Sequence, residues 1–123
     1  MNPTPFAQTW ADAWNRRDVE AVLAHFVDDV VFTSPTALVV TGNAVVRGKQ
    51  ALRAYWLAAL AKVESIHFTV DRVLWEASRR ELAIIYVERI NGASRMVSEN
   101  LVFGEAGLVT RAEVFHGARL APG

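Results

Sequence analysis

The chain has 123 residues, of which 52% are hydrophobic and 21% charged, enough apolar material for the core of one domain spanning residues 1–123. Thirteen basic residues balance 13 acidic ones, and without a basic stripe the composition argues against a nucleic-acid partner. The absence of cysteine excludes disulfides, thiolate metal sites and a thiol nucleophile. The sequence contains no stretch of about 18 apolar residues, so we expect no membrane-spanning helix. Residues 1–8 lack the pattern of a secretory leader, so we expect a cytoplasmic protein.

Three helices are expected in the first half of the chain. The first spans about residues 5–17, because Thr4 suits an N-cap and Pro5 suits the first helical position. Asp18 can cap a second, shorter helix that ends near His25, and a third helix covers about residues 49–62. Apolar residues at helical spacing give each helix one buried side: Phe6, Trp10, Ala13 and Trp14; Val22, Leu23 and Phe26; Leu52, Tyr55, Trp56, Ala59 and Leu60.

Strands are expected to form the rest of the domain. A first strand covers residues 30–34 and ends at Pro35, whereas residues 36–48 fit either a short strand or an ordered loop. Four more strands lie near residues 64–76, 81–90, 94–103 and 108–116, with hairpin turns at 91–92 and 104–107. Helices followed by a strand meander predict an α+β fold in which a curved antiparallel sheet packs against three N-terminal helices.

The alternation of side chains along the last strands assigns the two faces of the sheet. Pairing Ile90 with Ala93 and Phe103 with Leu108 places one set of residues on the face toward the helices: Leu82, Ile84, Tyr86, Glu88, Val97, Glu99, Leu101, Phe103, Thr110, Ala112, Val114 and His116. This register puts Glu99 between Ile84 and Ala112, and Arg95 between Glu88 and His116. The opposite face carries an apolar group, which predicts a homodimer: Ala83, Ile85, Val87, Met96 and Val102.

The order of these segments resembles one family over nearly the whole chain. The segments are "NRRDVEAVLAHFVDDVVFTSP" at residues 15–35, "VVRGKQALRAYW" at 45–56 and "GLVTRAEVFHG" at 107–117. They are similar to the nuclear transport factor 2-like superfamily, also called the SnoaL-like or ketosteroid-isomerase-like fold. The resemblance implies a cone open at one end, often dimeric through the outer face of the sheet. Function stays open, because the fold hosts isomerases, cyclases, epoxide hydrolases, dehydratases and non-catalytic binders.

The resemblance also implies which positions to compare with the steroid isomerases of this family. Their aspartate base corresponds to Ser34, and their oxyanion-hole tyrosine and acid correspond to Trp10 and Glu99. A supporting tyrosine corresponds to Trp56, and a pocket tryptophan to His116. Two of the three catalytic groups are therefore absent, so we expect negligible steroid isomerase activity.

The inward-facing polar residues are the candidate catalytic groups. Glu99 is either an acid–base group or hydrogen-bond donor in a dry pocket, or a structural acid satisfied by its neighbours. His116 suits a proton shuttle or an ordinary end-of-strand contact, and Tyr86 suits a ligand donor or core packing. Glu88 and Arg95 form either a carboxylate-binding pair or a cross-strand ion pair. The remaining candidate ligand-binding residues form the pocket wall: Trp10, Trp14, Phe26, Phe32, Ser34, Tyr55, Trp56 and Ala112.

Three functions are compatible with these residues. The first is a metal-free acid–base enzyme acting on a small apolar substrate as an isomerase, cyclase, dehydratase or epoxide hydrolase. The second is a non-catalytic module that binds a small apolar molecule, and the third is a structural dimer. His25, His67 and His116 lack metal-ligand spacing, and no glycine-rich phosphate loop is present, so no metal or cofactor is expected.

Overall fold

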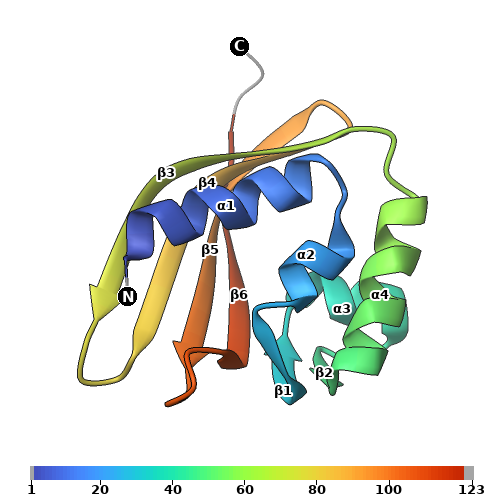
Figure 1. Cartoon of the computed structure of the whole chain (residues 1–123). Coiled ribbons are helices and arrows are strands. Elements are labelled where there is room, and N and C mark those ends of the chain that lie inside the picture. The colour runs from blue at the N-terminus through green and yellow to red at the C-terminus, as the bar shows by residue number, and fades with distance from the viewer. Residues whose placement is uncertain (1, 121–123) are drawn as a thin grey trace.

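A computed structural model describes residues 2–120 of the chain. Within these residues one six-stranded sheet has the order β2-β1-β6-β5-β4-β3, and helices cover its concave face (Figure 1). The elements are α1 (Pro3–Asn15), α2 (Val19–Leu23), β1 (Phe26–Thr33), α3 (Pro35–Thr41), β2 (Val45–Arg47), α4 (Lys49–Ala61), β3 (Ile66–Glu76), β4 (Glu81–Ile90), β5 (Ala93–Phe103) and β6 (Val109–Arg119). The predicted α+β architecture, with N-terminal helices packed on a curved, unclosed sheet, is confirmed. None of the helices in residues 2–120 is long and apolar enough to cross a membrane.

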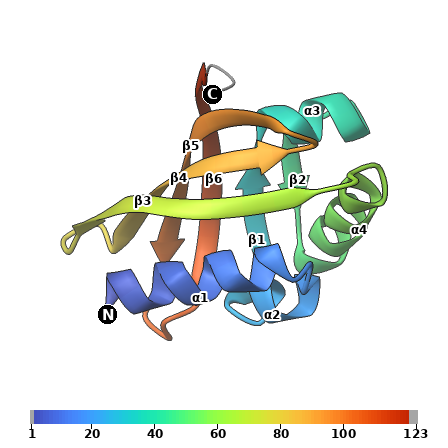
Figure 2. The ribbon, with the colours of Figure 1, turned by 90° about the horizontal axis from the view of Figure 1, so that it is seen from above.

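The sheet is antiparallel at every strand pair except one. β1 runs parallel to β6. After β1 the chain forms α3, β2 and α4 and then the β3–β6 meander, whose last strand, β6, lies beside β1. The longest strands, β3 to β6, form the curved wall, and α1 crosses that wall alongside β3 (Figure 2). α4 packs against β1 and β2, toward the opposite edge of the sheet.

Helix α1 attaches to the sheet through an apolar stripe and one polar clamp. Ala7, Trp10, Ala11 and Trp14 are buried at helical spacing, as the amphipathic pattern predicts. At the end of the helix, the Asn15 amide donates to the carbonyl of Phe68 (3.0 Å), and its side-chain oxygen accepts from the Phe68 N–H (2.7 Å). Asn15 therefore supplies at this point the backbone partner that the edge strand β3 lacks.

Residues 36–48, which the sequence left undecided, contain a short helix followed by a short strand. Ser34 is the N-cap of α3, since its hydroxyl accepts from the Thr36 N–H (3.2 Å), and Pro35 occupies the first turn. Gly42 ends α3 with a φ of 84°, the left-handed conformation that favours glycine at a helix C-terminus. β2 then pairs with β1, with Val46 opposite Phe32.

Candidate functional site

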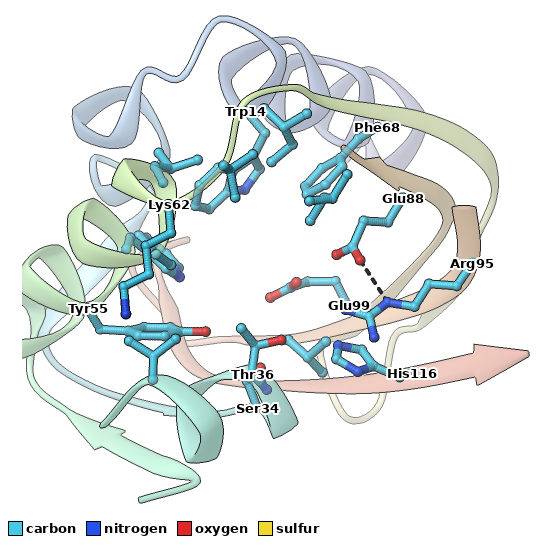
Figure 3. Close-up of a pocket in the computed structure, with 18 of the residues that line it drawn as sticks. Trp14, Ser34, Thr36, Tyr55, Lys62, Phe68, Glu88, Arg95, Glu99 and His116 are labelled. Atoms are coloured by element: carbon cyan, nitrogen blue, oxygen red, sulfur yellow. Dashed lines mark hydrogen bonds and ion pairs between the residues drawn. The ribbon is translucent and has the colours of Figure 1, made fainter. Parts of the chain in front are cut away.

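A cavity of about 280 Å³ lies between the helices and the concave face of the sheet (Figure 3). Its wall is mainly apolar and aromatic, with a few polar side chains that converge on the interior, as in many small-molecule sites. The wall consists of Trp14, Phe32, Ser34, Thr36, Val40, Tyr55, Trp56, Ala59, Leu60, Lys62, Val63, Ile66, Phe68, Tyr86, Glu88, Ile90, Arg95, Glu99, Val114 and His116.

The aromatic part of the wall is held by edge-to-face and tilted ring contacts. Trp56 on α4 lies at the centre, with ring centroids 4.9 Å from Trp14 and 5.5 Å from Phe32. On the sheet side, Phe68 and Tyr86 have centroids 4.7 Å apart. These contacts come from α1, α4 and three strands, so the rings are fixed before any ligand binds.

Glu99 is the buried acid of the cavity. Its β5 position lies opposite Ile84 on one neighbouring strand and Val114 on the other, and only 6% of its surface is exposed. Its carboxyl group points into the cavity, and within residues 2–120 it has neither a cationic partner nor a protein hydrogen bond (Figure 3). Burial, and secondarily the charge of Glu88, raise the pKa of Glu99 from 4.5 to about 8. At neutral pH the group is therefore mostly a protonated carboxylic acid, able to donate a hydrogen bond.

His116 on β6 is a second titratable group of the wall. It pairs in register with Val97, so it is a diagonal neighbour of Glu99 on the same face of the sheet. Burial lowers the pKa of His116, and the positive charge of Arg95 lowers it further, against a smaller opposing effect of Glu88. The imidazole is consequently neutral at pH 7 and can accept a proton.

Glu88 and Arg95 form an ion pair at one side of the cavity. Nε of Arg95 donates to Oε1 of Glu88 at 2.7 Å, across the register pair that joins β4 and β5. Both side chains are largely buried, so this pair is less screened than a surface ion pair. The pair fixes the Arg95 side chain next to His116 (Figure 3).

Two tyrosines add hydroxyl groups to the cavity. Burial raises the pKa of Tyr55 to about 12; an interaction with the Ser34 side chain opposes the rise, and the negative charges of Glu99 and Glu88 add to it. Burial and the same two carboxylates also raise the pKa of Tyr86 well above its usual value. Both phenols are therefore protonated throughout the neutral range and can act as hydrogen-bond donors.

Comparison with known proteins identifies the family. A family model described as the SnoaL-like domain matches residues 7–112. The chain belongs to the SnoaL-like domain family. A SnoaL-like protein of unknown function from Burkholderia thailandensis is 30% identical, with 94% of each chain covered and a TM-score of 0.84. None of the curated proteins matches this SnoaL-like domain.

Two further solved structures share the fold of this SnoaL-like domain. A hypothetical protein with a ketosteroid isomerase-like fold from Catenulispora acidiphila, in complex with trimethylamine, is 17% identical, with 94% of this chain and 88% of that chain covered and a TM-score of 0.72. A computationally designed 17-OHP binder is 23% identical, with 94% of this chain and 96% of that chain covered and a TM-score of 0.69. These likenesses confirm the predicted nuclear transport factor 2-like fold.

Most of the residues expected at the site of this SnoaL-like domain line its cavity. They are Trp14, Phe32, Ser34, Tyr55, Trp56, Tyr86, Glu88, Arg95, Glu99 and His116. Trp10, Phe26 and Ala112 do not line it. Trp10 packs against both Phe68 and Tyr86, and Phe26 packs against Trp56, so both belong to the core beneath the wall.

The placement of Ala112 corrects the expected register of the last strand. Ala112 pairs with Leu101, and Glu99 pairs with Val114, two residues away from the expected register. One residue of this shift arises at the turn, where Phe103 pairs with Val109 instead of Leu108, and the other arises at the irregularity between Val102 and Phe103. The shift is even beyond the irregularity, so Ala112, Val114 and His116 keep their expected face. Near the turn, the buried Val109 pairs with the inward-facing Phe103, in place of the expected Thr110. Arg95 likewise pairs with Arg119 instead of His116, after a second irregularity between Arg95 and Val97.

The sequence analysis missed several residues of the wall. Thr36 and Val40 lie on α3, which was not predicted, and Lys62 follows the end of α4. Phe68 belongs to β3, whose faces were not assigned, although its alternation with Val70 carries that signal. Within residues 2–120, no group of three histidine, aspartate or glutamate side chains gathers as a metal site would require.

Proposed function

We propose that this SnoaL-like domain binds a small, mainly apolar molecule bearing a carbonyl group and catalyses proton transfer on it. The observation that carries the proposal is the Glu99 carboxyl, which points into an apolar cavity with no cationic partner among residues 2–120. Burying an acid without a partner lowers the free energy of unfolding, so such a group gives the core no advantage. A carboxyl group kept neutral by its surroundings can, however, serve as a proton donor. Perturbed acids of this kind cluster at functional sites.

The pairing of Glu99 with His116 supports acid–base chemistry rather than binding alone. Burial raises the pKa of the acid and lowers the pKa of the imidazole, so at neutral pH the carboxyl carries its proton and the imidazole does not. Groups whose environments displace their pKa values in opposite directions can serve as general acid and general base together. As diagonal neighbours on adjacent strands, they have Cα atoms about 7–8 Å apart, so both side chains can reach one bound substrate.

The simplest reaction for this pair is enolisation. The Glu99 O–H donates to the carbonyl oxygen of a bound ketone while a ring nitrogen of His116 removes a proton from the adjacent carbon. The C–H electrons form the C=C bond of the enol, and the carbonyl π electrons take the proton from Glu99. Return of a proton from His116 to the same carbon, or to a conjugated one, restores the ketone or isomerises it, while the enol O–H gives its proton back to the Glu99 carboxylate and its O–H electrons re-form the C=O bond. Tyr55 also lines the cavity and would supply a second hydrogen-bond donor to the oxygen.

A proton-exchange assay tests the proposal without knowledge of the natural substrate. Propiophenone in D₂O at pD 7 is expected to lose its α-protons faster with the wild-type protein than with buffer, followed by proton NMR. Glu99→Gln keeps a hydrogen-bond donor but cannot transfer its proton, so exchange should fall by about 100-fold while binding, read from tryptophan emission, persists. Glu113→Gln, an exposed acid on β6, is the matched control and should leave exchange unchanged.

The second candidate function is ligand binding without chemistry. The designed 17-OHP binder favours it, since the same fold there is described only as a binder. Under this alternative, propiophenone quenches the emission of Trp14 and Trp56 but its α-protons exchange no faster than in buffer. Absence of both quenching and exchange across a panel of apolar ketones contradicts both functions and favours a structural role.

We also propose that two copies pair through the outer face of the sheet. Ala83, Ile85 and Val87 are half-buried there in the single chain, and Phe115 on β6 is 52% exposed. An apolar group that continues over one face of a sheet supports an interface there. The cytoplasmic location is a prediction from the sequence of residues 1–8, and a fractionation experiment tests it.

A further inference from the structure

A second hollow adjoins the cavity where the turn between β4 and β5 meets the end of β6. It has a volume of about 200 Å³ and is lined by Glu88, Ile90, Ala93, Ser94, Arg95 and Arg119. Glu88, Ile90 and Arg95 also belong to the wall of the main cavity, so the two spaces share one side. A ligand whose body fills the main cavity can therefore extend one end into the second hollow.

The charge of this hollow is unbalanced. Arg95 and Arg119 are register partners on β5 and β6, and two like charges directly opposite each other destabilise a sheet. Glu88 is the one carboxylate among the lining residues, and it already engages Arg95. Arg119 has no ion pair among residues 2–120. Among residues 2–120, one positive charge of this hollow is thus not matched by a carboxylate.

The geometry of Arg95 leaves its binding edge free. Glu88 accepts from Nε alone, at 2.7 Å, and the two terminal nitrogens donate to no residue within 2–120. Those nitrogens form the fork that binds a carboxylate through two parallel hydrogen bonds. The Glu88 contact fixes the guanidinium, so little conformational entropy is lost when the fork engages a ligand.

We propose that the hollow is a carboxylate subsite, and that the ligand of this domain is an apolar keto acid whose anionic end lies between Arg95 and Arg119. This inference rests on the proposed function, because the body of the ligand occupies the main cavity and its carbonyl group meets Glu99. A ligand of this kind carries its charge at the end in the second hollow and its reactive carbonyl at the buried end. The subsite thereby sets the direction in which the molecule enters.

A matched pair of probes tests the subsite apart from the cavity. 4-Oxo-4-phenylbutanoate and its primary amide share one body and differ in charge at the end, and calorimetry at pH 7 gives both affinities. The acid should bind the wild-type protein at least about tenfold more tightly than the amide, as expected for a charge-assisted bidentate contact. Arg119→Gln should reduce that ratio severalfold with the amide affinity unchanged, and Arg119→Lys should retain part of it.

Arg111→Gln is the control, since Arg111 is an exposed arginine on the same strand that lines neither space. It should leave the ratio as in the wild type. Equal affinities for acid and amide overturn the subsite and leave the proposed function intact. A preference for the acid that survives Arg119→Gln but disappears in Lys62→Gln also overturns it, because the charge is then read at the other side of the cavity. Binding of neither probe contradicts the subsite and the proposed function together.

Discussion

Replacing Glu99 with glutamine should stabilise the protein at neutral pH. Burial raises the pKa of Glu99 from 4.5 to about 8, so between these values the folded protein binds more protons than the unfolded chain. The free energy of unfolding therefore falls as pH rises through this window. At pH 7, about 2.5 pH units above 4.5, the loss is about 3 kcal/mol, because each unit corresponds to about 1.4 kcal/mol. Glutamine keeps the shape and carries no titrating proton.

Urea melts of both proteins from pH 4 to 9 measure this effect. The two should be similar near pH 4.5, and Glu99→Gln should gain over the wild type up to about pH 8, reaching about 3 kcal/mol at pH 7. Burial lowers the pKa of His25 and His116, so their contribution to stability is lost as pH falls below 6.5; it occurs in both proteins and cancels in the difference. A glutamine variant less stable than the wild type at pH 7, or a difference that does not change with pH, refutes the reasoning.

Three other predictions concern the surroundings of the site. Asn15→Ala should lower the free energy of unfolding by about 1–3 kcal/mol, because both backbone groups of Phe68 lose their partner, and unchanged urea melts would contradict the clamp. Glu88→Gln should lower the pKa of Glu99 by removing a nearby negative charge, a shift that ¹³C NMR of the carboxyl group detects and whose absence would rule out that coupling. Ile85→Glu should convert the expected dimer to a monomer in sedimentation velocity; a monomeric wild type at micromolar concentration would remove the outer-face interface.

The sequence predicts the inward-facing set because the side-chain period of a strand is fixed. The turn at Asn91 and Gly92 sets the pairing of β4 with β5, so Glu99 is correctly placed opposite Ile84. The predicted pairing of β5 with β6 is wrong by two residues, because neither the one-residue difference at the turn nor the irregularity after Val102 has a counterpart in the alternation of apolar residues. The even shift explains why the wall is nevertheless largely correct.

Other parts of the site depend on tertiary contacts that local patterns do not encode. The α3 helix has a cap at Ser34 and a proline in its first turn, yet its valines also suit a strand, so propensity alone leaves it undecided. The distinction between Trp14 on the wall and Trp10 beneath it depends on how α1 crosses the sheet. The second hollow requires the pairing of Arg95 with Arg119, which follows only from the irregular register.

The most direct test of the account is the protonation state of Glu99 with and without a bound ketone. ¹³C NMR titration of the glutamate carboxyl carbons, with Glu99→Gln to assign the signal, gives its pKa in the free protein and in the presence of propiophenone. We expect a pKa of about 8 in the free protein, and a higher one in the complex, because the ketone accepts a hydrogen bond only from the protonated acid. A pKa near 4.5, or one that falls when the ketone binds, would contradict a proton-donating Glu99.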